Sequence, residues 1–143
     1  MTLEVGSPVP GVAVAISEVP DPVFSQSMVG PGVAVKPPGG RSDAVAPITG
    51  TVVIASSVGT AVLVHLGLDT VKLKGEGFQL HVAKGDPVEA GQPIVSWDPT
   101  AVEDQGYSSI CPVVVLDAQP ESLSDLREDG AVAAGDPLCS VDP

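Results

Sequence analysis

The sequence contains few aromatic and few basic residues, and both shortages exclude classes of protein. Its 143 residues include two Phe, one Trp and one Tyr, so Val, Ala and Leu must fill the interior. The chain has six Lys and Arg residues and eighteen Asp and Glu residues, which gives a formal net charge of −12. Such an acidic surface suits a basic protein partner and is a poor match for nucleic acid or an anionic membrane. Simple solubility explains the charge equally well.

Long apolar runs and cysteine motifs are absent too. No stretch of eighteen apolar residues occurs, so we expect no membrane-spanning helix. Residues 1–4 lack the basic and apolar regions of a secretory signal, and we expect a cytoplasmic protein. Cys111 and Cys139 sit beside apolar strand residues without a Cys-x-x-Cys spacing. We expect two buried free thiols, with a disulfide between them as the alternative.

Glycine and proline, by contrast, are abundant. Sixteen glycines and fifteen prolines interrupt any long helix and are typical of many short strands joined by tight turns. The length suits one core, so we treat residues 1–143 as a single, all-β domain.

The expected elements follow from apolar segments between turn signals. Residues 20–22 predict an extended loop, because each proline restricts its predecessor, and Phe24 and Met28 are expected in the loop that follows. Asp98 is a good N-cap and Pro99 fits the first helical position, which predicts a helix to about residue 105. One further helical turn is expected over residues 122–126. Strands are expected over residues 12–18, 32–36, 51–55, 60–65, 70–73, 78–83, 93–97, 111–117 and 137–141.

Two pairs of segments resemble each other within the chain. Residues 7–14 are similar to residues 46–53, and residues 88–94 are similar to residues 132–138. Each unit is a turn followed by a short apolar strand. The pattern predicts a duplicated strand-and-turn motif whose two halves share one core.

The segment 62–78 holds the strongest candidate for chemistry, because an apolar strand pattern meets His65 and glycines follow. Neutral imidazole is a competent nucleophile near pH 7, and glycine leaves nearby backbone N–H groups accessible. A histidine at a strand end is also often a half-buried structural residue. The other histidine, His81, fits a structural role in a strand.

The sequence from His65 to Phe78, HLGLDTVKLKGEGF, resembles the phosphohistidine motif of the glucose-type enzyme IIA component of the bacterial sugar phosphotransferase system. Residues 20–24, 29–35, 46–50 and 111–115 extend the resemblance in order. It implies an antiparallel β-sandwich, barrel-like and built from a duplicated hybrid motif, with one or two short helices. It implies neither a metal nor a cofactor.

The resemblance also implies a function. His65 accepts a phosphoryl group on Nε2 from the histidine phosphocarrier protein and passes it to the cysteine of an enzyme IIB domain of a sugar permease. Such a carrier is a monomer that reaches the membrane only through the permease. Gly67, by its backbone, and Asp69 support the acceptor. The residues implied to contact the partners are Asp21, Phe24, Met28, Val29 and Val64.

Local chemistry leaves alternatives open for several of these residues. Asp21 and Asp69 also fit plain turn residues, and Phe24 and Met28 also fit a plug in the core. A biotinyl or lipoyl carrier would need a lysine at a hairpin tip, for which Lys84 lacks the usual flanking residues. A zinc peptidase would need more ligands than two separated histidines supply.

The chain departs from the glucose-type family in one respect. The family carries a second histidine on a strand before the acceptor, which bonds the phosphoryl group and supports onward transfer. Residues 52–57 contain no histidine, and the chain between Gly50 and His65 is short by roughly eight residues, about one strand. A deletion and an omission from the sequence both account for this. The alternative function is therefore a regulatory protein that docks with partners and relays phosphate poorly.

Overall fold

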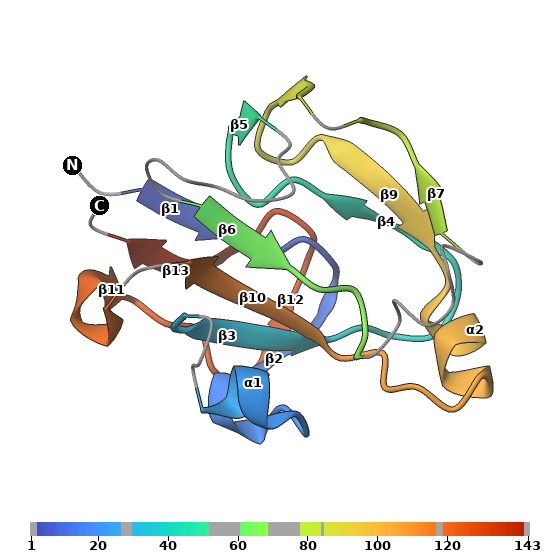
Figure 1. Ribbon diagram of the computed structural model, residues 1–143, viewed down its shortest axis with the longest axis horizontal. Helices are drawn as coiled ribbons and strands as arrows, with labels where there is room; N and C mark the ends of the chain where they lie inside the picture. Colours follow the sequence, from blue (N-terminus) through green and yellow to red (C-terminus); the bar gives the residue numbers. More distant parts are fainter. Residues whose placement is uncertain are drawn as a thin grey trace.

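The computed structural model describes residues 3–26, 30–51, 61–68, 78–83, 85–116 and 119–141. Strands dominate, and every pair among the described residues is antiparallel (Figure 1). The strands are β1 (Leu3–Gly6), β2 (Gly11–Ala15), β3 (Gly32–Lys36), β4 (Ser42–Val45), β5 (Gly50–Thr51), β6 (Ala61–Val64), β7 (Phe78–Leu80), β8 (Pro87–Val88), β9 (Pro93–Trp97), β10 (Cys111–Leu116), β11 (Leu123–Ser124), β12 (Ala131–Val132) and β13 (Pro137–Val141). The helices are α1 (Pro22–Ser25) and α2 (Pro99–Asp104), with 3-10 turns η1 (Ile16–Glu18) and η3 (Pro120–Ser122). None of the described helices is long and apolar enough to cross a membrane.

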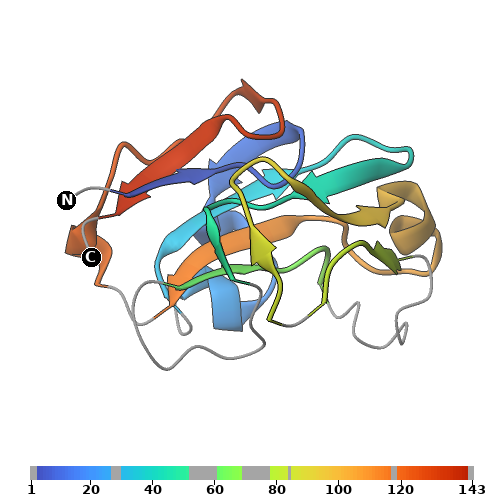
Figure 2. The same cartoon turned by 90° about the horizontal axis from the view of Figure 1, so that it is seen from above.

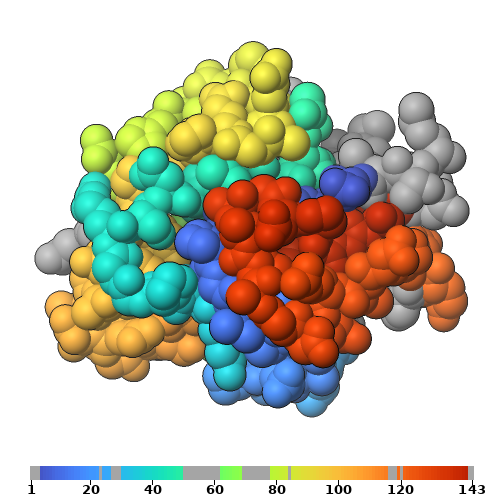
Figure 3. All heavy atoms as spheres, turned by 180° about the vertical axis from the view of Figure 1, so that it is seen from behind, coloured from blue at the N-terminus to red at the C-terminus, as the bar shows by residue number. Residues whose placement is uncertain are grey.

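The strands form one larger sheet and three smaller ones. The larger sheet has the order β12-β2-β3-β10-β6, and the others are β1-β13-β11, β4-β9-β7 and β5-β8. Figures 1 and 2 show β6 beside β10, with the β4-β9-β7 sheet at one end of the molecule. Seen from behind, the carboxyl-terminal strands (red) lie against the amino-terminal segments (blue) (Figure 3). The all-β fold expected from the glycine and proline content and the antiparallel pairing implied by the family resemblance are both confirmed.

The larger sheet is buried on both faces. Successive side chains of a strand point to opposite faces; accordingly Val113 and Val115 of β10 join one apolar cluster while Val114 joins another. The larger cluster also contains Trp97 and Leu138, so it lies between this sheet and the β1-β13 and β4-β9 strands. The smaller cluster contains Val14, Val19, Phe24, Ala34, Leu68, Ile110 and Val114. The smaller cluster therefore packs α1 against one face of the larger sheet.

The expected duplication is confirmed by matching hydrogen bonds. In one half, Ser7 N–H donates to Asp136 O (2.7 Å) and Gly135 N–H donates to Ser7 O (2.8 Å). In the other, Ala46 N–H donates to Gln92 O (2.9 Å) and Gly91 N–H donates to Ala46 O (2.9 Å).

The turns of the two halves correspond as well. The Asp136 carboxylate accepts from Ala133 N–H (2.8 Å), and the Gln92 side-chain oxygen accepts from Glu89 N–H (3.1 Å). These are the segments whose sequences resemble each other, so the internal similarity reflects a repeated backbone geometry.

Several expected elements match closely. The strands at 32–36, 93–97 and 137–141 have the expected bounds, and residues 111–116 form β10. The Asp98 side chain caps α2 by accepting from Thr100 N–H at 2.9 Å and Ala101 N–H at 3.4 Å. The two cysteines are buried and free, as expected.

Other expectations were wrong. The strand from residue 12 ends at Ala15, where η1 begins and the Glu18 carboxylate accepts from Ala15 N–H at 3.3 Å. Residues 22–25 form α1 where a loop was expected, because Pro22 opens a helical turn that Asp21 O caps. That carbonyl accepts from Phe24 N–H (3.0 Å) and Ser25 N–H (2.9 Å).

Near the carboxyl end, η3 and the strand β11 occupy the place of the helical turn expected over 122–126, since residues 123–124 pair with β13. The short strands β1, β4, β8, β11 and β12 were not expected, because two to four residues carry too little periodicity to be read. The expected strand over 70–73 and most of that over 51–55 fall outside the described residues.

Candidate functional site

His65 lies immediately after β6, where the chain leaves the ladder with β10. Val64 pairs with Val113, and His65 N–H donates to Pro112 O at 3.0 Å. The chain then turns through Gly67, whose φ of +82° favours glycine. Leu68 is buried beneath the turn, and its N–H donates to Ser108 O at 2.9 Å. The turn therefore holds the imidazole at the edge of a rigid strand pair.

The imidazole of His65 contacts the carbonyl of its own turn through Nδ1, which lies against Gly67 O. A carbonyl only accepts, so Nδ1 must carry the proton in this contact. The neutral ring then has its lone pair on Nε2. The turn itself selects the tautomer in which Nε2 carries the free lone pair.

Phe24 of α1 packs against His65 on the face of the larger sheet opposite the main core. The two ring centroids lie 5.6 Å apart, and the planes are tilted by 60°. Phe24 is only 7% exposed and belongs to the smaller apolar cluster. Its ring therefore supports the imidazole from the protein interior.

The structure brings together His65, Gly67, Phe24 and Val64, of which Val64 is half-buried. Asp21 is half-buried at the start of α1. The remaining predicted residues, Asp69, Met28 and Val29, lie outside the described residues. The role of these residues in contacting partners stays a prediction.

Sequence reasoning missed the segment from Ser108 to Pro112 that anchors the turn. Its carbonyls at Ser108 and Pro112 hold the backbone on either side of Gly67. The only sequence signal was the resemblance of residues 111–115 to a late strand of the family, which says nothing of contacts made to the histidine turn.

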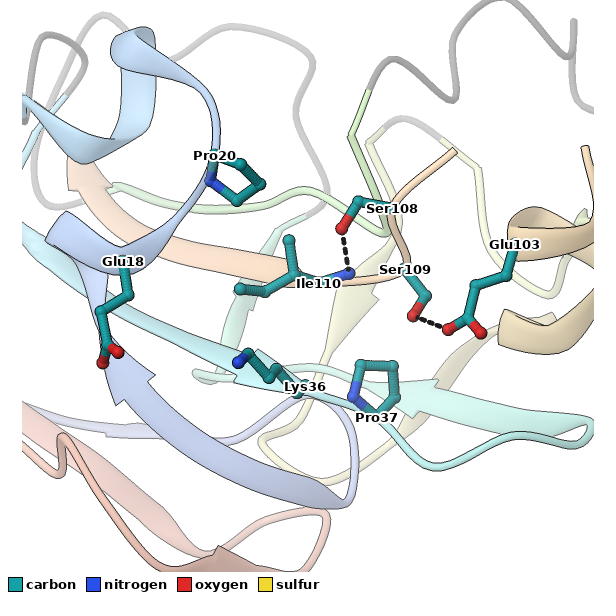
Figure 4. Close-up of a pocket in the computed structure, with 8 residues that line it drawn as sticks. All are labelled: Glu18, Pro20, Lys36, Pro37, Glu103, Ser108, Ser109 and Ile110. Atoms are coloured by element: carbon teal, nitrogen blue, oxygen red, sulfur yellow. Dashed lines mark hydrogen bonds between the residues drawn. The ribbon is translucent and has the colours of Figure 1, made fainter. Parts of the chain in front are cut away.

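A pocket of about 430 Å³ lies beside this anchoring segment (Figure 4). Its lining includes Glu18, Lys36 and Glu103, with Ser108, Ser109 and Ile110 from the anchoring segment. His65 is not part of the lining. The pocket and the imidazole are separate features that share one segment of chain.

His81 has a different environment. The strand expected over 78–83 ends at Leu80, and His81 is exposed just beyond it. Its Nε2 lies 2.6 Å from Ser96 Oγ, and that hydroxyl donates to Asp43 Oδ1 at 2.5 Å. These bonds connect His81, next to β7, with Ser96 in β9 and Asp43 in β4. They therefore link the three strands of the β4-β9-β7 sheet.

The family model described as "phosphoenolpyruvate-dependent sugar phosphotransferase system, EIIA 1" matches residues 3–120. The chain is 42% identical over 126 residues to the "PTS system glucose-specific EIIBCA component" of Corynebacterium glutamicum, covering 81% of this chain and 18% of that protein. It is 38% identical over 145 residues to the "PTS system beta-glucoside-specific EIIBCA component" of Bacillus subtilis, covering 94% of this chain and 24% of that protein.

Two shorter proteins are similar over more of their own length. The "PTS system glucose-specific EIIA component" of Oceanobacillus iheyensis is 39% identical over 123 residues, covering 79% of this chain and 73% of that protein. The solved structure of glucose permease IIA from Mycoplasma capricolum superposes with a TM-score of 0.89 at 30% identity. That match covers 99% of this chain and 97% of the other, and it supports the β-sandwich expected from the sequence. The chain thus spans about a fifth of the length of the EIIBCA relatives.

Proposed function

Because the chain belongs to the family of the phosphoenolpyruvate-dependent sugar phosphotransferase system, EIIA 1, we propose that it carries phosphoryl groups for sugar uptake. The group arrives at His65 Nε2 from a phosphohistidine of the histidine phosphocarrier protein. It leaves to the cysteine of an enzyme IIB domain. The relatives are named as EIIBCA and EIIA components of the PTS system, which favours this carrier over a regulatory protein that only docks.

The contact between His65 Nδ1 and Gly67 O carries the proposal. Because the carbonyl accepts a hydrogen bond from Nδ1–H, it favours the tautomer with the proton on Nδ1 and leaves the Nε2 lone pair for attack on phosphorus. In the first step the Nε2–P bond forms as the N–P bond of the donor breaks, and the donor imidazole keeps the electron pair. In the second step a P–S bond forms as the Nε2–P bond breaks.

Transfer of this kind passes through a loose transition state, so positioning and exclusion of water do most of the work. The Phe24 ring against the imidazole and the buried Leu68 beneath the turn supply that positioning. Gly67 keeps bulk away from the incoming donor, and we assign Asp69 a supporting role.

The partners follow from the names and the charge. Fusion of EIIA with EIIB and EIIC in the relatives from C. glutamicum and B. subtilis supports an enzyme IIB partner. The net charge of −12 suits a basic docking surface on the phosphocarrier protein. The relatives are named for glucose, β-glucosides and mannose, so similarity assigns no sugar to this chain.

We further propose that residues 1–143 form one enzyme IIA domain that acts as a cytoplasmic monomer and meets the membrane through a permease. We assign Val64 and Phe24 to the docking side because both are neighbours of the acceptor, with the buried Phe24 acting from behind the imidazole. Asp21, Met28 and Val29 complete this predicted partner-contact set.

The test is the intact mass of the protein after incubation with phosphoenolpyruvate, enzyme I and the phosphocarrier protein. We expect the mass to rise by one phosphoryl group. The chain has two histidines, which provides a matched pair of variants. His65→Gln should abolish the added mass and His81→Gln should preserve it. Retention of the added mass by His65→Gln would overturn the assignment.

A further inference from the structure

The peptide group between Gly67 and Leu68 holds the imidazole of His65 and is itself held by the anchoring segment. Its carbonyl, Gly67 O, contacts His65 Nδ1, and its N–H, which belongs to Leu68, donates to Ser108 O at 2.9 Å. In a planar trans peptide the C=O and N–H bonds point in opposite directions. The position of Ser108 O therefore determines where the Gly67 carbonyl points, and with it which nitrogen of the imidazole carries the proton.

The two ends of the anchoring segment are held in different ways. At one end, Pro112 lies in β10 and pairs with Ala34 of β3, so the sheet fixes the carbonyl that accepts from His65 N–H. At the other end, Ser108 comes before β10, which begins at Cys111. The strand ladder does not hold Ser108, so its position depends on contacts made by side chains.

A hydrogen bond from Ser109 to Glu103 of α2 supplies such a contact (Figure 4). Ser109 is buried, and its hydroxyl donates to the Glu103 carboxylate. A hydrogen bond to a carboxylate is stronger than one between neutral groups. The next residue, Ile110, donates its N–H to Ser108 Oγ at 3.3 Å. Residues 108–110 therefore form a braced unit that is attached to α2.

The helix α2 is a firm support for the Glu103 carboxylate. The Asp98 side chain caps its first turn, and Val102 is buried in the larger apolar cluster. After the helix, Tyr107 N–H donates to Val102 O at 3.2 Å. Glu103 is itself exposed, and its carboxylate reaches from the helix to the buried Ser109 hydroxyl. The bond thus connects the main core, through α2, to the anchoring segment.

We propose that Glu103 and Ser109 are positioning residues for His65. Their hydrogen bond holds Ser108 in place, Ser108 orients the Gly67 carbonyl, and that carbonyl keeps the imidazole proton on Nδ1. Without the bond, the peptide after Gly67 rotates and the proton is shared between Nδ1 and Nε2. The effect on rate rests on the proposed phosphoryl transfer, whereas the tautomer of His65 is independent of any partner.

The first test measures the tautomer of His65 in the unphosphorylated protein by 15N nuclear magnetic resonance of the ring nitrogens. Glu103→Gln keeps an oxygen that accepts from Ser109, and Glu103→Ala removes it. We expect the wild type and Glu103→Gln to hold the proton on Nδ1, and Glu103→Ala and Ser109→Ala to show a mixture of tautomers. Asp104→Ala removes the neighbouring exposed carboxylate of α2 and should leave the tautomer unchanged.

The exposure of Glu103 keeps this test decisive. Its replacement by Ala leaves no cavity in the core, so Glu103→Ala should fold even if Ser109→Ala does not. A wild-type tautomer in folded Glu103→Ala would overturn the proposal. A mixture of tautomers in the wild type would overturn it as well.

The second test measures the rate of phosphorylation of each variant by the phosphocarrier protein. We expect Glu103→Ala and Ser109→Ala each to be slower by up to about 10-fold, the low end of the loss seen when outer hydrogen-bond partners of metal-binding histidines are removed. Glu103→Gln should recover most of the rate. Because both Ala substitutions break the same bond, the double variant should be no slower than either single variant.

The rates also provide outcomes that contradict the proposal. Single losses that multiply in the double variant would show that Glu103 and Ser109 act separately, and equal rates in Glu103→Gln and Glu103→Ala would show that the bond is not the cause. Either result would overturn the proposal. Failure of the wild type to accept phosphate would instead overturn the proposed function and leave the tautomer result standing.

Discussion

The ring of Phe24 lies against the imidazole of His65, with centroids 5.6 Å apart and planes tilted by 60°. The two residues come from α1 and from the turn after β6, which are distant in the sequence. Tilted aromatic pairs at this separation attract each other beyond the area that they bury. Phe24 therefore serves the smaller apolar cluster and the acceptor at once.

Replacement of Phe24 should separate these two roles. Phe24→Ala should lower the free energy of unfolding by ~3–5 kcal/mol, because it leaves a cavity in the smaller cluster. Phe24→Leu should retain most of the stability and lose the ring contact, so phosphorylation should slow while the fold persists. Urea unfolding and the phosphorylation rate measure the two effects.

Phe78 provides the control, since it stacks on Trp97 at a centroid distance of 5.9 Å and is not part of the histidine turn. Phe78→Leu removes an aromatic pair of similar size. An equal loss of phosphorylation rate in Phe78→Leu and Phe24→Leu would mean that the effect is general destabilisation.

Gly67 should be more sensitive than a glycine of the same conformation elsewhere. Gly67 and Gly91 have φ values of +82° and +87°, so Ala at either position should cost roughly 1–2 kcal/mol of stability. Gly91 has open space around its missing side chain and lies in the turn before β9. We expect Gly91→Ala to accept phosphate at the normal rate and Gly67→Ala to accept it slowly. Similar phosphorylation rates in the two variants would contradict the role of the Gly67 backbone.

The buried thiols should make stability fall at alkaline pH. Burial raises the pKa of Cys111 from 9.0 to about 12 and that of Cys139 from 9.0 to about 11. Above pH 9 the unfolded chain loses these protons while the native state keeps them, so the free energy of unfolding decreases with pH. The full stability is present below pH 9. The slope should reach at most ~1.4 kcal/mol per pH unit for each thiol.

Denaturant unfolding between pH 8 and pH 11 checks this dependence. Cys139→Ala should show a shallower slope than the wild type across that range. If both proteins have the same slope, other groups govern the alkaline transition.

Onward transfer should be slow because the chain lacks the second histidine of the glucose-type family. Acceptance requires only the Nε2 lone pair and an in-line donor. Departure also requires donors that hold the phosphoryl group, and loss of one preorganised donor costs ~10²–10³ in rate in well-studied acyl-transfer sites. Inserting the family's histidine-bearing strand before His65 should restore the second step and leave the first nearly unchanged. Single-turnover transfer from the isolated phosphoprotein to enzyme IIB measures this. Fast transfer from the unmodified chain would show that backbone groups near Gly67 suffice.

The sequence predicted secondary structure correctly wherever a single residue type determines the backbone conformation. Asp98 followed by Pro99 located the start of α2, and proline and glycine separated the strands at 32–36, 93–97 and 137–141. The repeated segments predicted the duplication, because each half closes its own turn with an Asp or Gln side chain. The same signals misled at residues 22–25, where Pro22 was interpreted as extending a loop and in fact opens α1.

The sequence by itself determined that the fold is all-β, because glycine and proline divide it into short strands, and it marked His65 as the acceptor candidate through the resemblance of residues 65–78 to the family's motif. Tertiary structure alone decided which nitrogen of His65 carries the proton, because the Gly67 carbonyl reaches Nδ1 only when the turn is folded. It also decided that Phe24 of α1 packs against the imidazole of His65. Such contacts depend on how separate strands align, and a burial pattern within one strand carries no information about its partner across the sheet.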